Sequence, residues 1–241
     1  MNLVGFHATK EGYYRSYHDY KFKEKKLGRW QPWNPTIEVV LRKVENPVPM
    51  YARNTRWSGM EIPVVGEPVG FDLTAYDWVA PYGKGGHADF IFKLEKRFVS
   101  RKDFDSKLTL TFSNPLDGIQ VYKDDRKLGS DFKLPRFAPE TGYLNEYTRS
   151  KKRVPGSYFE EDFEEDNNYF FRIRSEEKDG KLVRAMYGKI QGEIVFEPMG
   201  RDTAGIHFKY YHNPDYTRNM EYDPKQNLFK DLPSRERVGL K

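Results

Sequence analysis

Tryptophan and arginine side chains in the first quarter of the chain have the types and spacing that sugar binding would need. Trp30 and Trp33 stand three residues apart in the segment WQPWNP, and Trp57 follows in the polar segment RNTRWS. An indole in a proline-stiffened loop presents a flat apolar face to a sugar ring, and arginine binds carboxylates through paired hydrogen bonds. The sequence therefore predicts a binding site for an acidic sugar, made of Trp30, Trp33, Trp57, Arg29, Arg53 and Arg56.

A packing role is the alternative for each of these indoles taken singly. Tryptophan is a large side chain that is well buried on average, so each of the three could cover the rim of a sheet and contribute to folding instead. Trp78 falls inside a strand pattern, and we expect it in the core.

The histidine and cysteine content gives no basis for a metal centre. The five histidines, His7, His18, His87, His207 and His212, form no compact ligand spacing, and the chain has no cysteine. We therefore predict no metal site, no disulfide, no cysteine nucleophile and no cofactor.

Two further segments resemble ion-binding motifs only in composition. Six carboxylates surround Phe163 within residues 160–166, without the spacing of a calcium loop, so we interpret the run as a solvated acidic loop that could pair with the basic residues 151–153. The glycine-rich segment 83–87 is interpreted as a turn, because a phosphate-binding loop needs a helix after it and no helix pattern follows.

A different set of side chains in the C-terminal half could perform acid–base chemistry. Arg174-Ser175-Glu176, then Gln191, then HFKYY over residues 207–211 follow one another along the chain. This order is similar to that of jelly-roll alginate-type polysaccharide lyases, whose strands carry Arg-Ser/Thr-Glu, Gln-Ile/Val-His and Tyr-Phe-Lys. The resemblance implies a lyase site formed by Arg174, Gln191, His207 and Tyr211, with the Tyr211 phenol as proton donor. Gly192 stands where that family has its histidine, so the group expected to neutralise the substrate or act as base is missing.

Period-two alternation of apolar residues dominates the chain, and helical periodicity is nearly absent. We predict an all-β protein, an antiparallel β-sandwich that is jelly-roll-like, with long irregular loops and an extended C-terminal tail. Helix content should lie below about 12 %, well under the globular average. Strands are predicted over residues 36–45, 69–79, 88–99, 107–112, 119–123, 168–175, 182–196 and 206–211, the last three as a meander.

Other segments carry weaker signals. A short helix is conceivable over residues 19–27, a hairpin tip over 124–127 and a turn over 198–205. Residues 129–159 are long for a structureless connection, which indicates a functional loop or strands without a recognisable pattern. We predict a polar N-terminal segment packed on the body over 1–35, a β-sandwich domain over 36–211 and the tail over 212–241.

Composition and charge bound the class of protein. Seventeen Phe, 17 Tyr and four Trp exclude a disordered chain, and the net charge is +5. Residues 1–60 hold eleven Lys and Arg against five Asp and Glu, a net charge of +6, so the net charge of the remaining residues is −1. A local basic surplus suggests an anionic partner, although a lysine-rich surface that aids solubility is the plainer interpretation. No nucleic-acid-binding motif and no apolar stretch of membrane-spanning length is present.

Together these features favour a non-catalytic β-sandwich module of a secreted or cell-surface bacterial protein. Its partner would be an acidic polysaccharide or a surface protein, and its signal or anchor would lie outside these residues, since the start lacks a signal-peptide pattern. Two alternatives remain open. One is a polysaccharide-degrading enzyme with the lyase-like site, and the other is a structural or assembly module that binds a partner protein.

Overall fold

The computed structural model describes residues 2–123, 129–198 and 203–239. Strands make up 51 % of the structure and helices 3 %, and the strands form several antiparallel sheets. This confirms the predicted all-β, sandwich-like fold and a helix content below about 12 %. The predicted hairpin tip at 124–127 lies outside the described residues, as do residues 199–202 of the predicted turn at 198–205.

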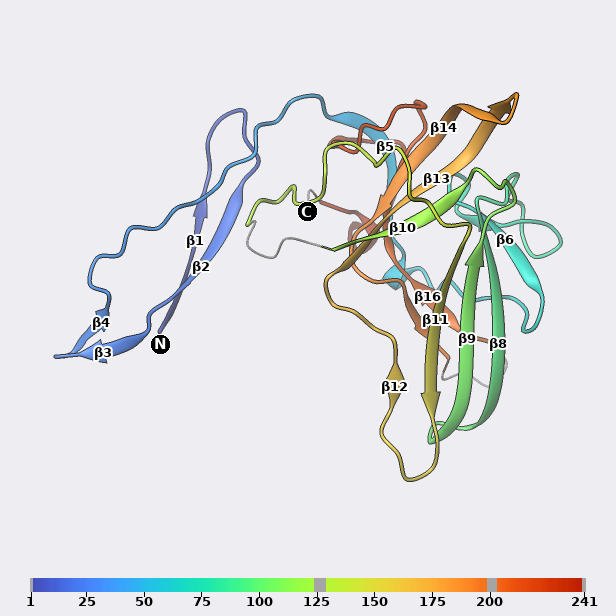
Figure 1. Cartoon of the computed structure of the whole chain (residues 1–241), viewed down its shortest axis with the longest axis horizontal. Helices are drawn as coiled ribbons and strands as arrows, with labels where there is room; N and C mark the ends of the chain where they lie inside the picture. Colours follow the sequence, from blue (N-terminus) through green and yellow to red (C-terminus); the bar gives the residue numbers. More distant parts are fainter. Residues whose placement is uncertain (1, 124–128, 199–202, 240–241) are drawn as a thin grey trace.

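One sheet has six antiparallel strands in the order β12-β11-β9-β8-β6-β7 (Figure 1). Its central hairpin forms because apolar residues alternate: Phe90, Phe92 and Leu94 of β8 are buried on one face, as are Leu108 and Leu110 of β9. The strands are β6 (Pro68–Asp72), β7 (Asp77–Trp78), β8 (Phe90–Ser100), β9 (Asp103–Thr111), β11 (Glu146–Arg153) and β12 (Glu160–Glu161).

The second sheet has six strands in the order β10-β13-β14-β17-β5-β18. All neighbours are antiparallel except β18 and β5, which are parallel. The predicted meander is present as β13-β14-β17, although the strand predicted over 182–196 ends at Ile190 and residues 195–197 pair in a separate two-stranded sheet. The strands are β5 (Val48–Asn54), β10 (Gly118–Lys123), β13 (Asn167–Lys178), β14 (Lys181–Ile190), β17 (Lys209–Asn213) and β18 (Tyr222–Asn227).

The main hydrophobic core lies between the two sheets and is rich in aromatic rings. Phe90 of β8 meets Phe171 of β13 edge to face, with ring centres 5.1 Å apart, which is a favourable geometry for two rings. Gly188 of β14 pairs with Phe171, and a Cβ at this glycine would collide with the Phe171 ring. Phe171 therefore needs glycine at position 188.

A second core covers the other face of the β10–β18 sheet. Tyr211, Phe170 and Ala52 point to that face and pack under Leu134 and Met220 from the connecting segments. Residues 212–239 contribute β18, the 3-10 turn η2 (Ser234–Glu236) and buried Val238 to this side of the molecule.

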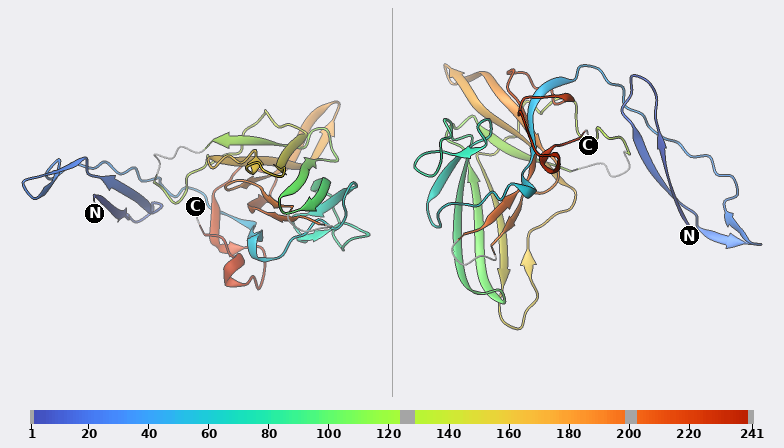
Figure 2. Two further views of the ribbon diagram at one scale, coloured as in Figure 1. Left: turned by 90° about the horizontal axis from the view of Figure 1, so that it is seen from below. Right: turned by 180° about the vertical axis from the view of Figure 1, so that it is seen from behind.

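The N-terminal residues form an arm beside the two large sheets (Figures 1 and 2). The arm consists of two separate hairpins, β1 (Leu3–Ala8) with β2 (Ser16–Lys21), and β3 (Glu24–Lys26) with β4 (Arg29–Gln31). Within residues 2–35 only Tyr14 and Ser16 are buried. The Tyr14 hydroxyl donates a 2.6 Å hydrogen bond to Glu221 of the body. The predicted domain boundaries at 35 and 211 stay predictions.

Two expectations about local structure are wrong. Residues 19–27 form parts of β2 and β3 instead of a helix. Residues 36–45 run from the arm to the body with a single β-bridge, between Lys43 and Tyr13. Their β-branched composition suits an extended chain, but no strand within the described part of the molecule runs alongside it; instead the Arg42 guanidinium donates hydrogen bonds to the carbonyls of residues 132–134.

Four strands of the two large sheets, β5, β11, β12 and β18, went unpredicted. In β11, which lies within residues 129–159, the buried positions are Arg149 and Lys151, so polar residues point both inward and outward. The Arg149 guanidinium lies 2.6 Å from the Glu193 carboxylate, and Lys151 Nζ lies 2.9 Å from Glu161. Because buried ion pairs replace apolar contacts, the alternation that marks a strand is hidden.

Candidate functional site

The β3–β4 hairpin at the end of the arm is built around a two-residue turn. Leu27 and Gly28 both have positive φ, 47° and 80°, which a type I′ turn requires. The turn brings Lys26 opposite Arg29 and Lys25 opposite Trp30. The hairpin thus presents basic and aromatic side chains together.

Aromatic and basic side chains of this hairpin and of the loop after it line a hollow of about 440 Å³, which we call the hairpin pocket. The Trp33 side chain is 66 % exposed, and the Arg29 guanidinium lies 4.8 Å from the centre of its ring. Trp30 is half-buried. The centre of its ring lies 6.3 Å from the centre of the Phe22 ring and 5.8 Å from Lys25 Nζ. The lining residues are Phe22, Gly28, Arg29, Trp30, Trp33, Asn34 and Pro35. Flat rings and a cation in one concavity can hold an apolar ring face and an anionic group at once.

Trp57 lies in the body, in a separate hollow of about 390 Å³ that also contains Arg56, Val195, Glu197 and His207. It belongs to the 3-10 turn η1 (Thr55–Trp57), which packs beside the hairpin of β15 (Val195–Glu197) and β16 (Gly205–His207). Thr55 anchors the turn, because its N–H donates to the Phe208 carbonyl and its hydroxyl accepts from the Phe208 N–H. Trp57 is 53 % exposed, with the Arg56 guanidinium 5.3 Å from its ring.

Arg53, the sixth predicted binding residue, has a different environment. Its side chain is 17 % exposed, forms an ion pair with Glu236 and stacks on Tyr76. The structure thus divides the predicted set: Arg29, Trp30 and Trp33 share one pocket, Arg56 and Trp57 share another, and Arg53 joins β5 to η2. Trp78 packs against the main core, as predicted.

Arg174, of the lyase-like set, is held by carboxylates. Its Nε and Nη2 atoms lie 2.7 Å and 2.9 Å from the two oxygens of Asp89, and Nη2 also reaches Asp72. Burial raises the pKa of Asp89, and the bond to Arg174 opposes that shift. This cluster neutralises the Arg174 charge where a lyase would need it for the substrate carboxylate.

The other three residues of the lyase-like set lie in different surroundings. The Tyr211 side chain points into the second core, and its hydroxyl donates a 2.8 Å hydrogen bond to the Gly239 carbonyl. Gln191 Oε1 lies 3.4 Å from that hydroxyl, whereas His207 faces the Trp57 hollow. The structure brings Gln191 and Tyr211 together, and it places Arg174 and His207 in two other hollows.

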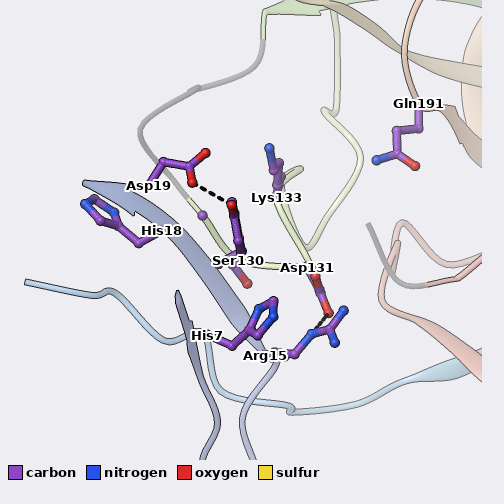
Figure 3. A pocket seen from close by; sticks show the side chains of 10 residues that line it. His7, Arg15, His18, Asp19, Ser130, Asp131, Lys133 and Gln191 are labelled. Carbon is purple, nitrogen blue, oxygen red and sulfur yellow. Dashed lines mark hydrogen bonds and ion pairs between the residues drawn. The ribbon is translucent and has the colours of Figure 1, made fainter. Parts of the chain in front are cut away.

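A further hollow, of about 660 Å³, lies between the arm and the body, and the sequence did not indicate it (Figure 3). Two polar pairs lie within it: Arg15 Nε lies 3.1 Å from Asp131, and the Tyr17 hydroxyl donates to Asp19. The lining residues are His7, Arg15, Tyr17, His18, Asp19, Gly129, Ser130, Asp131, Lys133 and Gln191. Sequence reasoning noted His7 and His18 but had no signal that joins them to residues 129–133.

The acidic run 160–166 and the glycine-rich segment 83–87 both form ion pairs or hydrogen bonds with other residues of the chain. Glu161 and Asp162 lie 2.9 Å from Lys151 and Arg149, and Asp166 lies 3.0 Å from Lys123. The N–H groups of Gly86 and His87 donate to Asp72, so those amides already have an anionic partner. Among the described residues, no three His, Asp or Glu side chains gather as a metal site would require.

Comparisons with protein-family models, curated proteins and solved structures found no match to this chain. Within residues 2–123, 129–198 and 203–239, no helix is long and apolar enough to cross a membrane.

Proposed function

We propose that the protein binds an acidic glycan without catalysis, and that the hairpin pocket is the binding site. The observation that supports this is the presence of Trp30, Trp33 and Arg29 around one hollow at the end of an arm beside the body. An exposed indole contributes packing and desolvation against the C–H face of a sugar, and the guanidinium supplies the partner for a uronate carboxylate.

The charge of the arm favours an anionic ligand over a neutral one. Residues 20–35 contain Lys21, Lys23, Lys25, Lys26 and Arg29 against one acidic residue, Glu24. All five cationic residues are exposed, so they raise the local concentration of a polyanion before contact. The proposal includes a secreted or cell-surface location in a bacterium, where such glycans are met.

The experiment is a calorimetric titration with polygalacturonate, neutral dextran and single-stranded DNA at several salt concentrations. We expect binding to polygalacturonate that weakens with salt but persists, because salt screens the Arg29 contact and leaves the indole packing in place. Dextran should bind much more weakly. Equal or tighter binding of DNA would contradict the glycan assignment, as would binding that salt abolishes completely.

A further inference from the structure

The first strand of the arm, β1, combines an apolar sequence with an exposed position. Its residues, LVGFHA, include no charged side chain, and Leu3 and Val4 are 44 % and 51 % exposed. Among the residues that the structure describes, β1 pairs with β2 alone. Natural edge strands are usually blunted by lysine, proline or a bulge, and β1 has none of these.

The hydrogen bonds of the arm show which backbone groups of β1 point outward. The N–H of Tyr17 donates to the Gly129 carbonyl, away from β1, so Tyr17 and its partner His7 form a non-hydrogen-bonded pair. At the other end the N–H of Phe22 donates to the Asn2 carbonyl. By alternation, the N–H and C=O groups of Leu3, Gly5 and His7 face away from β2.

The opposite edge of this small sheet is already covered. Ser16 forms an antiparallel bridge with Ser130, and the N–H of Asp131 donates to the Arg15 carbonyl. The outer edge of β1 is therefore the place where this sheet can gain a strand. A two-stranded hairpin beside the core is marginally stable in water, so an added strand would stabilise the arm.

We infer that β1 pairs antiparallel with β1 of a second copy of this chain, about a two-fold axis. A strand with no charge can lie opposite itself without placing like charges face to face. The two-fold contact uses the same edge of both copies. The far edge of β2 is covered by residues 129–131 at Arg15–Tyr17 and carries the charged Asp19 and Lys21 further along, so the assembly closes as a dimer instead of growing into a fibre. This inference is independent of the proposed glycan site, which lies on the other hairpin.

The first test measures molar mass by light scattering through a dilution series. The parent chain should be dimeric at high concentration and dissociate on dilution. Val4→Lys should shift the population to monomer, because lysine on an edge strand opposes pairing. The matched control is Val40→Lys, since Val40 is exposed to a similar degree, 56 %, and lies outside any strand; it should leave the dimer intact. A monomeric parent at every concentration overturns the inference, as does equal loss of dimer in both variants.

The second test examines the backbone contact itself. His7→Pro removes an outward N–H and spares the ladder to β2, so it should raise the dimer dissociation constant about thirtyfold, from two lost hydrogen bonds per dimer. In the parent dimer the amides of Leu3, Gly5 and His7 should exchange slowly with solvent deuterium, and they should exchange freely after dilution or in Val4→Lys. Free exchange of these three amides in a parent dimer would show that another surface forms the interface, which contradicts the inference.

Discussion

The Nη2 atom of Arg53 lies 2.5 Å from Oε2 of Glu236, and the Arg53 guanidinium lies 3.5 Å from the centre of the Tyr76 ring. The two side chains of the ion pair are 17 % and 5 % exposed. Arg53 thus joins β5 to the C-terminal turn η2 through its Nη2 donor and packs on Tyr76 within the fold. It is a structural residue, although its neighbours in sequence suggested a place in a binding site.

Arg53→Ala should lower the free energy of unfolding by about 2–3 kcal/mol, because Glu236 would remain nearly buried without its partner. Denaturant unfolding followed by tryptophan fluorescence measures this. Arg29→Ala is the comparison: Arg29 is exposed, so stability should change by less than about 0.5 kcal/mol while glycan binding weakens. The assignment fails if Arg53→Ala weakens glycan binding and leaves stability unchanged.

Lys189 should make stability rise with pH. Burial first, and then the charge of Arg42, lower the pKa of Lys189 to about 7, against the opposing effect of Glu221. Between that pH and about pH 10 the unfolded chain binds more protons at this lysine than the folded protein does, so folding becomes more favourable as pH increases, by at most about 1.4 kcal/mol per pH unit. Below about pH 7 the lysine is charged in both states and adds no slope.

Lys189→Met should remove this rise, which urea unfolding of both proteins across the same pH range will show. If the free energies of unfolding of parent and variant change equally with pH from neutral to alkaline conditions, folding does not lower the pKa of Lys189, and the prediction is wrong.

Chelation should leave the melting temperature unchanged. Glu161, Asp162 and Asp166, the carboxylates of the acidic run with the closest contacts, lie within 3.0 Å of Lys151, Arg149 and Lys123, and these cations take the place that a calcium ion would fill. Differential scanning calorimetry with EDTA, with excess Ca²⁺ and with neither provides the measurement. A melting temperature that falls by several degrees with EDTA and recovers with Ca²⁺ would reveal a metal site.

The protein should not cleave polyuronates by elimination. Tyr211, the proton donor implied by the lyase resemblance, is fully buried; burial raises its pKa, and its hydroxyl is bonded to the Gly239 carbonyl. Alginate or polygalacturonate incubated with the protein should develop no ultraviolet absorbance from an unsaturated uronate. Absorbance that grows with time in the parent and not in Tyr211→Phe would support the polysaccharide lyase hypothesis instead.

The fold was predictable where apolar alternation coincides with burial. The β8 and β9 strands, with Phe90, Phe92 and Leu108 inward, follow that rule. It fails in β11, where Arg149 and Lys151 are the inward residues and are compensated by the carboxylates of Glu193 and Glu161. It also fails for residues 36–45, whose strand-like composition finds no partner strand among the described residues.

The candidate site was predictable only where its residues are neighbours in sequence. Trp30, Trp33 and Arg29 meet because a single tight hairpin turn holds them, and a local pattern can reveal that. Arg53 and Glu236 meet across 183 residues, and Trp57 shares a hollow with His207, 150 residues away, because the turns η2 and η1 pack against the distant strands β5 and β16. No local sequence pattern encodes such contacts. The sequence alone therefore could not show that the six predicted binding residues lie in three different places.

The affinity of Trp33→Ala for polygalacturonate, measured by calorimetry beside Trp57→Ala, tests the proposed function most directly. Both indoles are largely exposed, at 66 % and 53 %, and each has an arginine over its ring, so they are a matched pair. We expect Trp33→Ala to weaken binding by about 1–3 kcal/mol with stability unchanged, and Trp57→Ala to bind like the parent. Unchanged affinity in Trp33→Ala, or a loss of about 3 kcal/mol or more in its folding stability, would contradict the hairpin pocket as the binding site.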